Sequence, residues 1–178
     1  PLVYAYYDGL DKVAHERGFG EFYDAELRAC DRLVEEIIGR LPPGTVLYVT
    51  ADHGQVFVGD DTVPMPAEIL AAVRTQSGEG RFRWLHAVRG AESDLLAAAT
   101  ESFGDVAWVV SRQRIIDEGW FGPVVRPAAL RRLGDVALVP FRDISFDDPA
   151  DGGHFVLQCR HGSMTKEEVE VPLLVYSS

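Results

Sequence analysis

The stretch Val46-Leu47-Tyr48-Val49-Thr50-Ala51-Asp52-His53-Gly54 decides the fold class of this chain. Its first four residues form a continuous apolar run, which is typical of a strand covered on both faces of a parallel sheet. A carboxylate, an imidazole and a glycine follow after Thr50 and Ala51, and packing in a core explains such a set poorly. Ligands of open parallel sheets gather at the carboxyl ends of the strands. The stretch therefore predicts an α/β fold with ligand-binding side chains at one edge of the sheet.

A helix and a second apolar segment precede this strand. Apolar residues recur at spacings of three and four through residues 23–41, which predicts an amphipathic helix, and Pro42-Pro43-Gly44 ends it. Residues 2–7 are apolar and aromatic and predict a buried strand, and residues 8–20 are expected to form a loop. The order strand, helix, strand favours a right-handed crossover and a parallel sheet of the α/β/α type.

The remaining chain predicts an α/β insert over residues 60–149, between the two parts of a metal-binding core at residues 1–59 and 150–178. Within the insert, helices are expected at residues 66–75, 92–101 and 112–118, and strands at 82–88, 106–110 and 136–139. The second part of the core is expected to hold a strand at 155–159, a helical turn near 165–168 and a strand at 171–176.

Composition narrows the class of partner. The chain has 178 residues, a hydrophobic content of 47% and a formal net charge of −11. That charge argues against a nucleic-acid polymer, whose phosphates require a basic surface. A small phosphate ester remains compatible, because bound divalent cations would reverse the local potential. No apolar run approaches the roughly 20 residues of a membrane helix, so no membrane partner is expected.

Two further features bear on context. Cys30 and Cys159 do not form a disulfide framework, which favours a reduced, cytoplasmic setting. The chain begins at Pro1, inside a predicted core strand, so we expect it to be the C-terminal part of a longer protein.

Five side chains are candidate metal ligands. Asp11 and His15 follow the first predicted strand, Asp52 and His53 follow the second, and His161 lies near the C-terminus. Carboxylate oxygen combined with imidazole nitrogen suits Zn²⁺ or Mn²⁺ better than Mg²⁺ or Ca²⁺. Taken alone, the Asp-x-x-x-His spacing is also compatible with a surface ion pair. For His86, His154 and Cys159 a structural role is the favoured interpretation.

Three segments together resemble the C-terminal half of the alkaline phosphatase superfamily, in its type I phosphodiesterase/nucleotide pyrophosphatase branch. They are Tyr7-Asp8-Gly9-Leu10-Asp11-Lys12-Val13-Ala14-His15, Thr50-Ala51-Asp52-His53-Gly54 and Arg160-His161-Gly162-Ser163. The resemblance implies that Asp11, His15 and His161 hold one zinc-type ion and that Asp52 and His53 hold a second one. It is weakest over the insert.

The resemblance also implies a function. A protein with these segments would hydrolyse phosphodiester or pyrophosphate bonds of nucleotide-like substrates with two divalent cations, Zn²⁺ or Mn²⁺. The Thr or Ser nucleophile of the family lies upstream and has no counterpart in this sequence, so the N-terminal half of the same protein is the expected partner and this chain alone is expected to be inactive. The alternatives are a phosphomonoesterase, phosphomutase or sulfatase of the same superfamily, or a non-catalytic assembly module.

Overall fold

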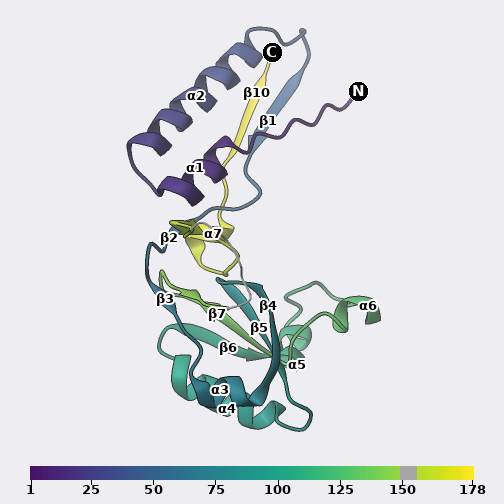
Figure 1. Cartoon of the computed structure of the whole chain (residues 1–178). Helices are drawn as coiled ribbons and strands as arrows, with labels where there is room; N and C mark the ends of the chain where they lie inside the picture. The colour runs from purple at the N-terminus through teal and green to yellow at the C-terminus, as the bar shows by residue number, and fades with distance from the viewer. Residues whose placement is uncertain (149–155) are drawn as a thin grey trace. The chain divides into compact units, whose positions relative to one another are not determined.

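The computed structural model describes residues 1–148 and 156–178, and the chain divides into two compact units. Unit 1 comprises Pro1–Asp60, Gly153–His161 and Lys166–Ser178, and unit 2 comprises Asp61–Gly152 and Gly162–Thr165. Figure 1 labels the elements of both units. Among the described residues, no helix has both the length and the apolar character needed to cross a bilayer. The predicted role of His154 falls outside the described residues.

Unit 1 is built from two packed helices, a two-stranded ribbon and a smaller strand pair. Its elements are α1 (Gly9–Arg17), α2 (Glu21–Ile38), β1 (Val46–Thr50), β2 (Val56–Phe57), β9 (Cys159–Arg160), α7 (Lys166–Val169) and β10 (Leu173–Ser177). Strand β1 pairs with β10 and β2 pairs with β9, both antiparallel. The second pair is important for the site, because it connects the chain after β1 to the segment that ends at His161.

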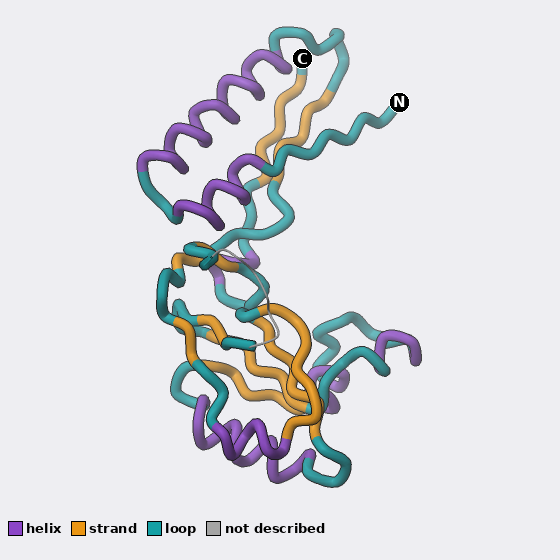
Figure 2. The backbone as a smooth tube through the Cα atoms, in the orientation of Figure 1, coloured by secondary structure: helices purple, strands orange, loops and turns teal. Residues whose placement is uncertain are grey.

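The predictions for unit 1 are confirmed in part. Helix α2 and strand β1 lie where the apolar patterns indicate. The predicted parallel sheet is wrong, because β1 pairs antiparallel with β10. Residues 2–7 are not a strand: they form no helix or strand (Figure 2), since a strand needs hydrogen-bonding neighbours and the described residues supply none there. The predicted loop at residues 8–20 contains α1.

Unit 2 centres on a four-stranded antiparallel sheet in the order β4-β5-β7-β6. Its elements are β3 (Thr62–Val63), α3 (Ala67–Ala72), β4 (Val73–Glu79), β5 (Phe82–Ala87), α4 (Glu92–Phe103), β6 (Ala107–Ser111), α5 (Arg112–Asp117), α6 (Pro127–Leu130), β7 (Val136–Pro140) and β8 (Ser145–Phe146). The pair β3 with β8 is parallel. The helix expected at residues 66–75 ends at Ala72, because the following residues pair with β5 as strand β4.

Each face of the unit 2 sheet supports a buried cluster. One face packs against α3 and α4 around Ile69, Leu85, Leu95 and Leu138, all of which are fully buried. The opposite face packs Trp84, Ala137 and Val139 against α5 through Ile115. The alternation of side chains along β5 and β7 supplies both clusters, as expected of strands covered on both sides. Unit 2 therefore has a core of its own.

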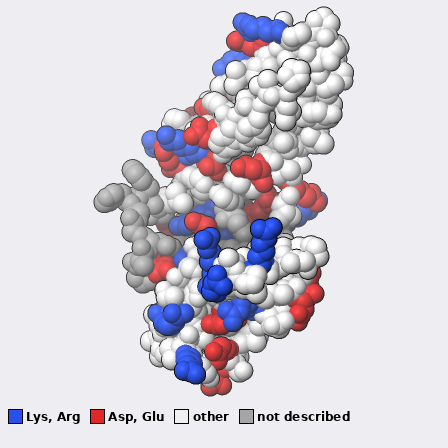
Figure 3. All heavy atoms as spheres, turned by 90° about the vertical axis from the view of Figure 1, so that its right-hand side faces the viewer, with Lys and Arg blue, Asp and Glu red and all other residues white. Residues whose placement is uncertain are grey.

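Unit 1, by contrast, exposes a broad apolar surface. On the face of the ribbon that carries Tyr48, its partner Val175 and the neighbouring Leu173 are 56% and 64% exposed. Residues 2–7 add further exposed apolar side chains, and no residue of α2 is buried. Figure 3 shows few charged side chains on the part of unit 1 where Figure 1 shows β1 and the N-terminal segment. Exposed apolar areas of this kind mark interaction surfaces.

Candidate metal centre

The candidate ligands come from three separate segments of unit 1. Asp11 and His15 lie one turn apart on α1, so their side chains share a face of that helix. Asp52 and His53 follow β1 after Ala51, and His161 directly follows β9. Pairing of β2 with β9 brings the last segment beside the first two. A backbone hydrogen bond also joins the chain just before β9 to α1, because the Gln158 amide donates to the His15 carbonyl at 2.8 Å.

These segments place the five side chains in one cluster. The ligand atoms of Asp11, His53 and His161 all lie within 4.8 Å of one another. His15 Nε2 is 3.3 Å from Asp11 Oδ1, and His53 Nε2 is 4.0 Å from the same oxygen. The rings of His53 and His161 stack with centroids 3.6 Å apart. Asp52 Oδ1 lies at the rim, 3.8 Å from His53 Nε2, with its side chain 64% exposed.

Backbone carbonyls orient two of the imidazoles. His15 Nδ1 lies 2.7 Å from the Cys159 carbonyl oxygen, and His53 Nδ1 lies 3.0 Å from that of Gly54. A carbonyl oxygen only accepts hydrogen bonds, so each Nδ1 carries the hydrogen and, in the neutral ring, Nε2 presents its lone pair. Both Nε2 atoms face Asp11. Lone pairs and carboxylate oxygens thus converge, an arrangement that a bound cation stabilises.

Gln55 is a member of the site that sequence reasoning missed. Its side-chain amide donates a hydrogen bond to Asp11 Oδ1. This bond fixes the carboxylate that both His15 and His53 approach. The available signal was its position two residues after His53, immediately before β2, where a polar side chain would point back toward the preceding loop.

Negative charge gathers around the cluster. The carboxylate of Asp52, with smaller contributions from burial and from Asp11 and Asp8, raises the pKa of the exposed Tyr6 phenol above its usual value. The thiol of Cys159 differs from the carboxylate and imidazole ligands. Burial raises the pKa of its thiol to about 11, and among the described residues its sulfur is not in the group of ligand atoms that lie within 4.8 Å of one another. The ligand chemistry of the site is therefore that of carboxylates and imidazoles.

Gly54 holds the loop of His53 against α7. Its amide donates to the Glu168 carbonyl at 2.8 Å, and a Cβ at this position would overlap the carbonyl oxygen of Glu167. We expect Gly54→Ala to displace the loop, to lower the free energy of unfolding by about 1–3 kcal/mol and to weaken metal binding. Urea unfolding and zinc titration measure the two effects. The matched control is Gly39→Ala, where a Cβ meets neighbours at ordinary contact distances; equal effects in the two variants would contradict this role.

Comparisons with known proteins identify the family of the chain. Residues 1–163 match the family described as type I phosphodiesterase/nucleotide pyrophosphatase, which confirms the resemblance of the three segments. Murine ectonucleotide pyrophosphatase/phosphodiesterase 5 matches with a TM-score of 0.66 and 14% identity, over 94% of this chain and 45% of that one. A comparison with curated proteins gave no match.

A bacterial enzyme shows the same fold. Phosphonoacetate hydrolase from Sinorhizobium meliloti 1021, in complex with phosphonoformate, matches with a TM-score of 0.67 and 20% identity, over 93% of this chain and 43% of that one. At these identities the likeness concerns the fold. The chain spans less than half the length of the structures that it matches.

Proposed function

Because the chain belongs to the type I phosphodiesterase/nucleotide pyrophosphatase family, we propose that it supplies the metal-binding part of a metal-dependent phosphoesterase. The proposed substrates are phosphodiesters or pyrophosphates of nucleotide-like compounds. The observation that carries the proposal is the convergence of acceptor atoms on Asp11. Two imidazole nitrogens oriented by backbone carbonyls approach one carboxylate oxygen at 3.3 and 4.0 Å.

The donor set fits zinc-type cations. Asp11, His15 and His161 would hold one ion, and Asp52 with His53 would hold a second, with Zn²⁺ favoured over Mn²⁺. Asp11 Oδ1 lies within 4.0 Å of the Nε2 atoms of both His15 and His53. Bound cations would neutralise phosphoryl oxygens and lower the pKa of an attacking hydroxyl. Gln55 would position Asp11 through the hydrogen bond described above.

The remaining catalytic groups are proposed to come from another part of the same protein. The matched structures are more than twice as long as the part of them that this chain covers. The apolar face of the β1–β10 ribbon is the surface on which we place that partner, which would bring the Thr or Ser nucleophile. On this account the five ligands hold the cations, and this chain by itself turns over no substrate.

Substrate class is tested with matched esters and the complete protein. We expect zinc-loaded protein to hydrolyse bis(p-nitrophenyl) phosphate at least about tenfold faster, in kcat/KM, than p-nitrophenyl phosphate, since a difference of 1.4 kcal/mol in transition-state binding suffices. p-Nitrophenyl sulfate serves as the third substrate. Faster turnover of the monoester or of the sulfate would instead assign the protein to a phosphomonoesterase or sulfatase activity.

A further inference from the structure

One segment of unit 2 is basic, although the chain as a whole is acidic. Between residues 112 and 132 the sequence has five arginines and two acidic residues, although the whole chain has a formal net charge of −11. Figure 3 shows basic side chains gathered on the side of unit 2 where Figure 1 shows α5 and α6. The arginines are Arg112, Arg114, Arg126, Arg131 and Arg132.

Two of these arginines are already paired, and two others lie at a pocket. Arg112 binds Asp135 at 3.0 Å, and Arg114 binds Glu118 at 2.6 Å. In the part of the chain that the structure describes, neither Arg126 nor Arg132 has an acidic partner. Both are solvent-exposed, and unpaired guanidinium groups of this kind are the usual protein ligands of phosphate and carboxylate groups.

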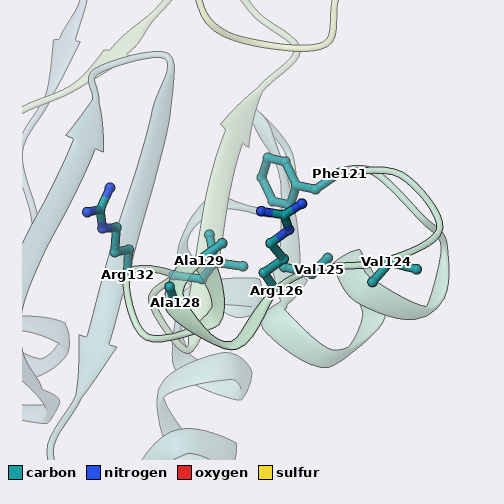
Figure 4. Close-up of a pocket in the computed structure, with 8 residues that line it drawn as sticks. Phe121, Val124, Val125, Arg126, Ala128, Ala129 and Arg132 are labelled. Carbon is teal, nitrogen blue, oxygen red and sulfur yellow. The ribbon is translucent and has the colours of Figure 1, made fainter.

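The pocket combines these cations with an apolar lining. It has a volume of about 610 Å³, and Figure 4 shows its residues. The Arg126 guanidinium lies beside the Phe121 ring in that view, whereas Arg132 lies on the other side of Ala128 and Ala129. Phe121 is 49% exposed, so its ring is available to a ligand. The lining residues are Phe121, Val124, Val125, Arg126, Ala128, Ala129, Arg132 and Leu133.

The loop that forms the pocket is held in place before any ligand arrives. Gly119 and Gly122 have φ values of 72° and 86°, a region that favours glycine, and the Gly122 amide donates to the Gly119 carbonyl at 2.8 Å. Pro127 fixes the first turn of α6, and the Phe121 ring lies 6.5 Å from that of Trp84. A preformed site loses little conformational entropy on binding.

We propose that this pocket binds an organic phosphate with an aromatic body, of the nucleoside monophosphate class. The aromatic group would stack on Phe121 beside Arg126, and the phosphate, at the other end of the ligand, would take charge-assisted hydrogen bonds from Arg132. The site belongs to unit 2 alone and uses none of the metal-centre residues. It therefore stands independently of the proposed function.

The test measures AMP binding to the 178-residue chain in the presence of EDTA, so that no metal contributes. Calorimetry, with tryptophan fluorescence as a second readout near Phe121, gives the affinity. We expect saturable AMP binding that weakens at least about tenfold in Arg126→Ala/Arg132→Ala, because each charge-assisted hydrogen bond contributes about 1.5–3 kcal/mol. Phe121→Ala should weaken binding of AMP but leave that of inorganic phosphate unchanged.

The matched control is Arg89→Ala/Arg131→Ala, which removes the same charge from exposed positions outside the pocket. We expect it to change the AMP affinity by less than about twofold, because screening weakens charges that do not contact the ligand. Equal losses in the two double variants would overturn the proposal, as would AMP binding no tighter than inorganic phosphate. Absence of saturable AMP binding would overturn it as well.

Discussion

Replacing His53 and His161 together by alanine is expected to remove bound metal from the chain. The two rings stack 3.6 Å apart, and both belong to the group that places ligand atoms within 4.8 Å of one another. Loss of two ligands should lower zinc affinity by more than about 100-fold, since removal of a group that merely orients a ligand already costs 10–100-fold. Elemental analysis after dialysis against a Zn²⁺ buffer measures the effect.

The control for this experiment removes an imidazole elsewhere. His86 lies on β5 in unit 2, where its Nε2 is 2.8 Å from Ser77 Oγ. His86→Ala should therefore retain the metal content of the parent chain. Metal that persists in His53→Ala/His161→Ala, or that is lost equally in His86→Ala, would contradict the assignment of the site.

The second prediction with a large expected effect concerns the exposed β1–β10 ribbon of unit 1. We expect the isolated chain to self-associate at micromolar concentrations, because each large apolar side chain buried in a contact contributes about 1.5–3 kcal/mol. Leu173→Lys/Val175→Lys places two charges on the face that also carries Tyr48. This variant should be monomeric by light scattering, and in the complete protein it should prevent the two halves from packing.

Exposed positions of unit 2 provide the control for that variant. Ser93→Lys/Gln113→Lys adds the same charge away from the ribbon and should associate as the parent does. A parent chain that stays monomeric at all concentrations would contradict the role given to this surface, as would association that persists unchanged in Leu173→Lys/Val175→Lys.

Sequence patterns predicted most elements whose stability is local or whose apolar pattern is strong. The stripe of residues 23–41 indicates α2, and the apolar runs of residues 46–49 and 136–139 indicate β1 and β7. Strand direction was not predictable in the same way. A short apolar run fits either direction, so the expected parallel sheet gave way to antiparallel pairing of β1 with β10.

Two local features could not be predicted from the sequence patterns, for physical reasons. Residues 2–7 have strand composition, but strand formation depends on neighbours that the sequence does not specify. Helix α1 has weak amphipathic character, and so the segment resembles a loop although Asp11 and His15 lie one turn apart. The candidate ligands were identified from residue type and order, whereas Gln55 becomes visible only through its contact with Asp11.

The most direct test of the account is anomalous diffraction from crystals grown with Zn²⁺. We expect a zinc peak in contact with the ligand atoms of Asp11, His15 and His161, at metal–ligand distances of about 2.0–2.2 Å. Occupation of a second position, beside Asp52, would follow if both ions bind. A chain that carries zinc only at other residues, or that shows no peak within bonding distance of Asp11, would contradict the proposed metal centre.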